Sequence, residues 1–199
     1  QDVQNVLKSI GRRPGVVAMD PNACNEGFEY NLSSDPSYAT ISLVDKSGQT
    51  ICAVAENGNG SKPNFADRDW FQETIRTDGF VAMGPYSGRL TGVNVVVMAN
   101  PIHDINEAIV GVVVLSVPTT KFHPIFNLDA APPDVTVSIV NRRGTVVHTD
   151  SRTHHGAGND LGPVIMRRVL QTTSGTGVDR DAGGTELVFG FWHRLLLFR

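Results

Sequence analysis

The short segment DRDWF combines one guanidinium with two carboxylates and two aromatic rings. An amphipathic stretch follows it, so we expect Arg68 at the point where a loop becomes a helix. There the guanidinium and the free N–H groups of the first helical turn can together bind a carboxylate. Trp70 and Phe71 would supply flat apolar walls. A structural alternative also stands, in which Asp67 or Asp69 caps the helix and both rings belong to the core.

A second group of polar residues lies in the segment GPYSGRLTG, which we expect to form a hairpin after the helix. Loops on a rigid sheet often carry function, and Tyr86, Arg89 and Thr91 could lie over the mouth of a pocket. The alternative for Arg89 is a solvated turn. In the strand that follows, successive side chains face opposite sides of the sheet. Either Asn94 or Val95 therefore faces the pocket, and the sequence leaves that choice open.

The sequence contains none of the short motifs that carry catalytic chemistry. It has no G-x-S-x-G, no P-loop, no HExxH and no glycine fingerprint behind a strand. Its histidines are isolated, except for His154 and His155 in a glycine-rich segment. Cys24 and Cys52 lack the paired spacing of a zinc site. We therefore expect no catalytic residues, no metal site and no cofactor.

The composition excludes several classes of protein. Of the 199 residues, 40% are hydrophobic and 19% are charged, which is ordinary for a globular chain. The net charge is −3, and the Lys and Arg residues are scattered, so no nucleic-acid partner is expected. The longest apolar run, AIVGVVVLSV, is shorter than the roughly 20 residues that span a bilayer and predicts a buried central strand. The start has no signal-peptide pattern, and both ends suggest a piece of a longer protein.

Two segments with one pattern, ISLVDKSGQTI and VSIVNRRGTVV, predict the same hairpin at two places. In each, apolar residues at every second position lead to Asp45 or Asn141, and Gly48 or Gly144 supplies the positive φ that closes the loop. Each hairpin is followed by a helical pattern, a glycine and a further apolar strand, at matched spacing. The sequence therefore predicts a tandem of two related α+β modules.

The boundaries of these modules follow from the proline-rich segment between them. We expect an N-terminal helix that continues upstream, with a connecting loop, over residues 1–34. The first module covers residues 35–117. A linker with a short helix occupies residues 118–134, and the smaller second module covers residues 135–199.

The stretch from residue 65 to 117 resembles the ligand-binding module of Cache domains. These are PAS-like extracytoplasmic sensors of bacterial and archaeal histidine kinases, diguanylate cyclases and chemoreceptors. The resemblance rests on the Asp67-Arg68-x-Trp70-Phe71 motif, the GPYSGRLTG hairpin, the ANPI strand end and the GVVVLSV strand. It is close for residues 35–117 and weaker after residue 135. The double Cache arrangement implies a long N-terminal helix with a membrane-distal and a membrane-proximal module, each a central antiparallel sheet flanked by helices.

The resemblance also implies which residues contact a ligand. In amino-acid-binding double Cache domains, the motif's Arg and Trp match Arg68 and Trp70 here, but the following Tyr is Phe71 and an upstream Tyr falls on Pro63. The Asp that holds the ligand's ammonium falls on Ser116, and a buried ammonium without a carboxylate partner is costly. An anionic or neutral small molecule, with a carboxylate as one candidate, therefore fits better than an amino acid. The expected binding set is Arg68, Trp70, Phe71, Tyr86, Arg89, Thr91, Asn94 and Ser116.

The resemblance places the chain outside the cytoplasm, where an even number of cysteines favours a disulfide. Similar chains carry a Cys in each of these two places. It therefore implies a bond between Cys24 and Cys52 that joins the exit of the N-terminal helix to the sheet.

The function implied by the resemblance is that of a non-enzymatic, periplasmic input domain of a transmembrane sensor histidine kinase. The first module would bind the ligand, and the second, which has DLGPVIMRR in place of the motif, would transmit the signal. A homodimer through the N-terminal helix and membrane anchors outside this chain are further expectations. The alternatives are the input domain of a diguanylate cyclase or a chemoreceptor, and a sensor whose partner is a periplasmic protein.

Overall fold

The computed structural model describes residues 3–55, 60–122, 137–141, 143–149, 165, 167, 171, 174–180 and 186–192. It divides into two compact units, one with the described residues up to Phe122 and one with the described residues from 137 onward. Most of the expected linker, its short helix beyond Phe122 and all of the DLGPVIMRR segment except Ile165 and Arg167 lie outside the described residues. The division into two related modules therefore stays a prediction.

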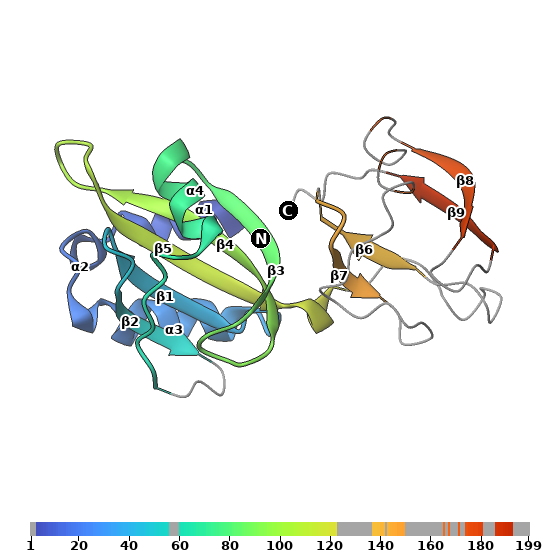
Figure 1. The fold of residues 1–199 in the computed structure, drawn as a ribbon. Helices are drawn as coiled ribbons and strands as arrows, with labels where there is room; N and C mark the ends of the chain where they lie inside the picture. Colours follow the sequence, from blue (N-terminus) through green and yellow to red (C-terminus); the bar gives the residue numbers. More distant parts are fainter. Residues whose placement is uncertain are drawn as a thin grey trace. The chain divides into compact units, whose positions relative to one another are not determined.

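The first unit contains a five-stranded antiparallel sheet with the strand order β2-β1-β5-β4-β3 (Figure 1). Its strands are β1 (Thr40–Asp45), β2 (Thr50–Ala55), β3 (Val81–Ser87), β4 (Asn94–His103) and β5 (Ile109–Pro118). The central strand, β5, pairs with both β1 and β4 and is buried over most of its length. The prediction that the longest apolar run forms a buried central strand is confirmed.

Helices cover both faces of this sheet. They are α1 (Val3–Gly11), α2 (Pro14–Val17), the 3-10 turn η1 (Pro21–Ala23), α3 (Cys24–Ser34), α4 (Asp69–Thr77) and the 3-10 turn η2 (Thr119–Lys121). Along β5, Val113 and Leu115 pack with α1 and α3, whereas Val112 and Val114 pack with α4. This alternation divides the core into two apolar clusters, one on each face. The expected α+β class, a central antiparallel sheet with flanking helices, is confirmed.

The N-terminal region differs from the expected helix and connecting loop over residues 1–34. The first helix ends at Gly11, and Pro14, which has no N–H to donate and suits a first helical turn, begins α2. The residues that follow are mostly helical, because η1 and α3 occupy them. How far the first helix extends upstream of Val3 stays a prediction.

The hairpin predicted at two places is present at both. In the first unit, the Asp45 carboxylate accepts hydrogen bonds from the N–H groups of Ser47 and Gln49, and Gly48 has a φ of 85°. In the second unit, the Asn141 side chain accepts from the N–H groups of Arg143 and Thr145, and Gly144 has a φ of 88°. The same turn chemistry thus closes both loops.

The described strands of the second unit form two separate pairs. The hairpin at Gly144 joins β6 (Ser138–Val140) to β7 (Val146–Thr149), and β8 (Ser174–Arg180) pairs antiparallel with β9 (Glu186–Trp192).

Candidate functional site

The first unit contains a pocket of about 40 Å³ between the sheet and two segments, the approach to α4 and the β3–β4 hairpin. A single water molecule needs about 10–15 Å³ of such space, so the pocket has room for about three. Its lining residues are Thr40, Ser42, Phe65, Arg68, Trp70, Tyr86, Ser87, Gly88, Arg89, Leu90, Thr91, Val95, Val97, Val114 and Ser116.

Arg68 lies where the sequence predicts it, at the start of a helix. It is the N-cap residue of α4, with extended backbone angles, and no side chain caps the helix from that position. The carboxylate of Asp69 lies in the first turn, where it accepts hydrogen bonds from the Trp70 N–H at 2.9 Å and from the Tyr86 hydroxyl at 2.5 Å. Neither Asp67 nor Asp69 is therefore the N-cap residue, although Asp69 lies where the helix dipole favours a negative charge.

The guanidinium of Arg68 is half-buried at the rim of the pocket. Its Nη2 donates to the backbone carbonyl of Ser87 at 3.2 Å, and its central carbon lies 5.8 Å from the centre of the Tyr86 ring. Arg68 makes no ion pair with any residue that the structure describes. Within the described part of the chain, no carboxylate forms an ion pair with this charge, although Arg68 helps to lower the pKa of Asp67.

Aromatic rings form one wall of the pocket. The Trp70 side chain is 2% exposed, and its ring centre lies 5.4 Å from that of Phe65 and 5.9 Å from that of Phe71. Trp70 and Phe65 line the pocket, but Phe71 does not. Phe71 is therefore a core residue, which is the structural alternative considered for it from the sequence.

Hydroxyl groups form the floor of the pocket. Thr40 and Ser116 face each other across β1 and β5, and their hydroxyl oxygens are 2.7 Å apart. Both residues and Ser42 are buried. No carboxylate is among the described residues that line the pocket. The floor can therefore exchange hydrogen bonds with a ligand but cannot neutralise a cation.

The hydroxyl of Thr91 is buried and has no hydrogen-bond partner within the described part of the chain. A buried polar group without a partner costs about 1–3 kcal/mol. A ligand with a donor or acceptor at this point would recover that free energy.

Arg89 lines the pocket but is already engaged. Its two terminal nitrogens contact the two carboxylate oxygens of Asp67 at 2.7 and 2.6 Å, and one of them also donates to the carbonyl of Asn64. The guanidinium lies 5.7 Å from the centre of the Phe65 ring. Hydrogen bonding from Arg89 lowers the pKa of the Asp67 carboxyl to about 2, and the same contact raises the pKa of Arg89. The charge of Arg89 is thus matched within the protein.

The structure brings most of the sequence-derived set into one pocket, namely Arg68, Trp70, Tyr86, Arg89, Thr91 and Ser116. Asn94 is exposed and does not line it, and Val95 is the neighbour that does. Thr40 and Ser42 were not predicted from the sequence as site residues, although both are polar residues at alternate positions of an otherwise apolar strand. That pattern indicates a polar patch on one face of the sheet, but it gives no pairing partner.

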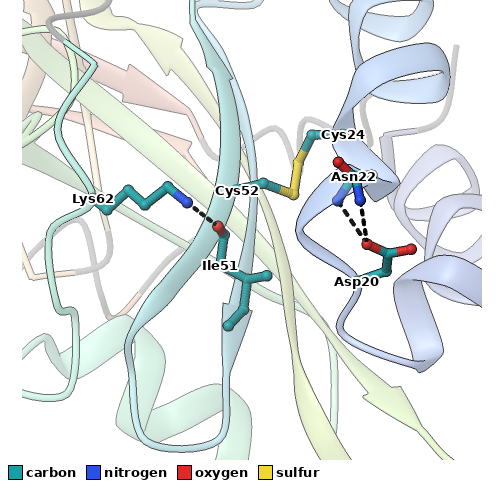
Figure 2. Close-up of a disulfide and its surroundings, with 6 residues drawn as sticks. All are labelled: Asp20, Asn22, Cys24, Ile51, Cys52 and Lys62. Atoms are coloured by element: carbon teal, nitrogen blue, oxygen red, sulfur yellow. Dashed lines mark hydrogen bonds between the residues drawn. A yellow bond between two sulfur atoms is a disulfide. The ribbon is translucent and has the colours of Figure 1, made fainter.

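The disulfide expected between Cys24 and Cys52 is present in the structure, with an S–S distance of 2.08 Å (Figure 2). It joins the first residue of α3 to β2, and both cysteines are buried in the cluster on the α1 and α3 side of the sheet. Figure 2 also shows Lys62 donating to the Ile51 carbonyl at 2.8 Å beside it. The bond therefore lies on the face of the sheet opposite α4, and neither cysteine lines the pocket.

No family model matches the chain. Sporulation kinase D of Bacillus subtilis (strain 168) is 24% identical over 128 residues, which are 64% of this chain and 24% of that protein. The chain therefore spans about a quarter of the length of the curated relative that it matches.

Solved structures match over a larger share of the chain. The extracellular domain of rpHK1S-Z16, a protein assigned as a histidine kinase, has a TM-score of 0.70 at 17% identity, covering 93% of this chain and 85% of that one. The ligand-binding domain of the Campylobacter jejuni chemoreceptor Tlp3, in complex with L-valine, has a TM-score of 0.62 at 16% identity, covering 94% and 77%.

These likenesses bear on the fold. Among the described residues, no helix is long and apolar enough to cross a bilayer, and the solved neighbours are extracellular or ligand-binding domains of receptors. The resemblance to Cache sensors is confirmed at this level. The chain has the fold of the extracellular sensor domains of histidine kinases and chemoreceptors.

Proposed function

We propose that this chain is the extracytoplasmic input domain of a transmembrane sensor histidine kinase and that it binds a small molecule in the pocket of the first unit. One observation carries the proposal: within a sensor fold, an arginine that makes no ion pair with a described residue lies beside aromatic walls and a hydroxyl floor. The fold shared with extracellular domains assigned to histidine kinases and the relative sporulation kinase D support the kinase assignment.

The ligand is anionic or neutral, and a small carboxylate fits best. Its carboxylate would bind Arg68, and its polar atoms would reach the Thr91 and Ser116 hydroxyls. The neighbour Tlp3 binds L-valine, but here the hydroxyl of Ser116 faces that of Thr40 and offers no counter-charge to an ammonium. An amino acid is therefore disfavoured.

The domain itself is not an enzyme, and the kinase belongs to the remainder of the longer protein. A homodimer through the N-terminal helix and membrane anchors outside this chain complete the proposal. The likeness to the chemoreceptor Tlp3 favours a second candidate, the input domain of a chemoreceptor.

A thermal-shift screen of the purified chain tests the proposal, with small carboxylates, sugars, amines and amino acids as the probes. A carboxylate at 100 times its Kd should stabilise the folded chain by about 2.7 kcal/mol, which raises the unfolding midpoint by several degrees. The Arg68→Ala variant should lose this shift. Without ligand, its unfolding midpoint should equal that of the parent chain.

Arg12→Ala is the matched control, because it removes the same charge from an exposed position outside the pocket. It should keep the full shift. A best ligand that is a cation, or a carboxylate that stabilises Arg68→Ala equally well, would contradict the proposal. If no small molecule bound, a periplasmic protein would become the leading partner.

A further inference from the structure

Two chain segments cover the mouth of the pocket. The first, here called the covering loop, consists of residues 64–68 before α4. The second, here called the covering hairpin, consists of residues 87–92 between β3 and β4. Both contribute lining residues, Phe65 and Arg68 from the loop and Leu90 and Thr91 from the hairpin.

Among the described residues, Arg89 makes the most extensive contacts between these two segments. Its guanidinium forms a bidentate ion pair with Asp67, donates to the carbonyl of Asn64 and lies over the ring of Phe65. All three partners belong to the covering loop. A planar guanidinium that meets both carboxylate oxygens fixes orientation as well as distance. The contact thus resists both sliding and lifting of the covering hairpin.

The covering hairpin has the internal bonds of a unit that can move as one piece. The Gly88 N–H donates to the Val93 carbonyl at 2.8 Å, and the Gly92 N–H donates to the Gly88 carbonyl at 2.7 Å. Besides Arg89, two residues hold the hairpin down. Leu90 is buried in the apolar cluster on the α4 side, and Arg68 of the covering loop donates to the Ser87 carbonyl at 3.2 Å. Lifting this piece therefore breaks few bonds, and the Arg89–Asp67 ion pair is one of the small number of contacts that oppose it.

The pocket is small. A volume of about 40 Å³ leaves room for about three water molecules. A ligand larger than this fits inside only if a lining segment, such as the covering hairpin, moves. The contacts that hold the hairpin closed must then affect how fast a ligand enters and leaves.

We propose that Arg89 and Asp67 are positioning residues of this pocket: their ion pair latches the covering hairpin onto the covering loop and sets how often the pocket opens. Arg89 then acts on a ligand through the hairpin, whereas Arg68 contacts it. The proposal rests on the proposed function only in taking this pocket as the ligand site, and the latch itself can be tested without a ligand.

Acrylamide quenching of Trp70 fluorescence in the full 199-residue chain tests the latch. Trp70 lines the pocket and is 2% exposed, so acrylamide reaches it mainly when the pocket opens. The other tryptophan, Trp192, is replaced by Phe in every sample. In Arg89→Gln and in Asp67→Asn, the quenching rate constant should rise by about 1.4- to five-fold, the range expected for losing one exposed ion pair.

Matched variants separate a latch from a general loss of stability. Arg76→Gln removes an ion pair of the same kind, Arg76–Glu73 at 2.6 Å. Neither Arg76 nor Glu73 lines the pocket, so this variant should leave quenching unchanged. Exchanging the charges, with Asp67→Arg and Arg89→Asp together, should restore slow quenching. Unfolding midpoints within about 4 °C of the parent chain would show that the fold is intact.

The proposal is wrong if both single variants quench like the parent chain, or if Arg76→Gln raises quenching as much as they do. Asp67→Asn keeps the test decisive even where Arg89→Gln unfolds, because the side chain of Asp67 is 65% exposed. A latch that fails this test leaves the ligand proposal standing. A chain that binds no small molecule can still have the latch.

Discussion

Arg68 and Arg89 show how two arginines at one pocket can differ in what they offer a ligand. Both line it, but the charge of Arg89 is matched by Asp67, whereas the contacts of the Arg68 guanidinium with described residues are a hydrogen bond to a backbone carbonyl and an aromatic ring. A guanidinium that already holds a carboxylate must give it up before it can bind another. Arg68 is therefore the anchor in this account, and Arg89 is the residue that holds the pocket shut.

The Asp67 carboxyl should report this pairing directly. Its pKa is about 2 because Arg89 donates hydrogen bonds to it, and in Arg89→Gln it should rise toward the ordinary value of 3.8. Carbon-detected NMR titration of the side-chain carboxyls measures both values.

The sign of the effect on stability follows from the direction of the shift. Because folding lowers the pKa of Asp67, the ion pair stabilises the fold fully above the unfolded pKa and loses its contribution as the pH falls toward 2. The difference in stability between the parent chain and Arg89→Gln should therefore shrink between about pH 4 and pH 2. A pKa for Asp67 that is the same in both proteins would show that the pair does not form in solution.

The residues of the site that the sequence could predict are those carried by a local motif. Arg68 and Trp70 stand together in DRDWF, and Tyr86, Arg89 and Thr91 stand together in one hairpin. The residues that these side chains contact could not be predicted in the same way. Asp67 is next to Arg68 in the chain but pairs with Arg89, 22 residues away, and Thr40 meets Ser116 across 76 residues. Such pairs depend on which strands and loops become neighbours, which no local pattern contains.

At the scale of elements, the strength of the local pattern decides what can be predicted. The β5 strand is one continuous apolar run, and the hairpins at Gly48 and Gly144 carry a turn residue and a positive-φ glycine at matched positions. By contrast, among the side chains of α3 whose burial is described, those of Cys24 and Phe28 are the buried ones. Because the apolar stripe of α3 is weak, the sequence predicted a connecting loop there.

The disulfide fixes this weakly patterned helix to the sheet. Cys24 and Cys52 are 28 residues apart, and closing a loop of that size stabilises the folded state by about 3–4 kcal/mol in the chain-entropy account. Urea unfolding of the chain with and without reductant should show a loss of this order.

Replacing both cysteines with Ala removes the bond without leaving a buried thiol and should make stability independent of reductant. The intact protein should be lighter than the reduced protein by two hydrogens. Two thiols that alkylate freely without reductant would contradict the bond.

At the scale of the whole molecule, the first unit carries the pocket. A ligand that binds one state of this pocket better than another shifts the balance between them by no more than its difference in affinity. The equilibrium between the open and closed pocket would respond to two kinds of contact. Ligand contacts at Arg68 and Thr91 would act on it from inside the pocket, and the latch at Arg89 would act from its mouth. A sensor needs this combination, because a pocket that is open in every state transmits nothing.

The measurement that tests the central claim most directly is calorimetric titration of the chain with the best carboxylate from the screen, its primary amide and the amine of the same skeleton. The account predicts that the acid binds, that the amide binds at least ten-fold more weakly, which corresponds to about 1.4 kcal/mol, and that the amine does not bind. In Arg68→Ala the acid should bind no better than the amide. Equal binding of the acid and the amide, or an acid whose affinity is unchanged in Arg68→Ala, would contradict the claim that Arg68 anchors an anionic ligand in this pocket.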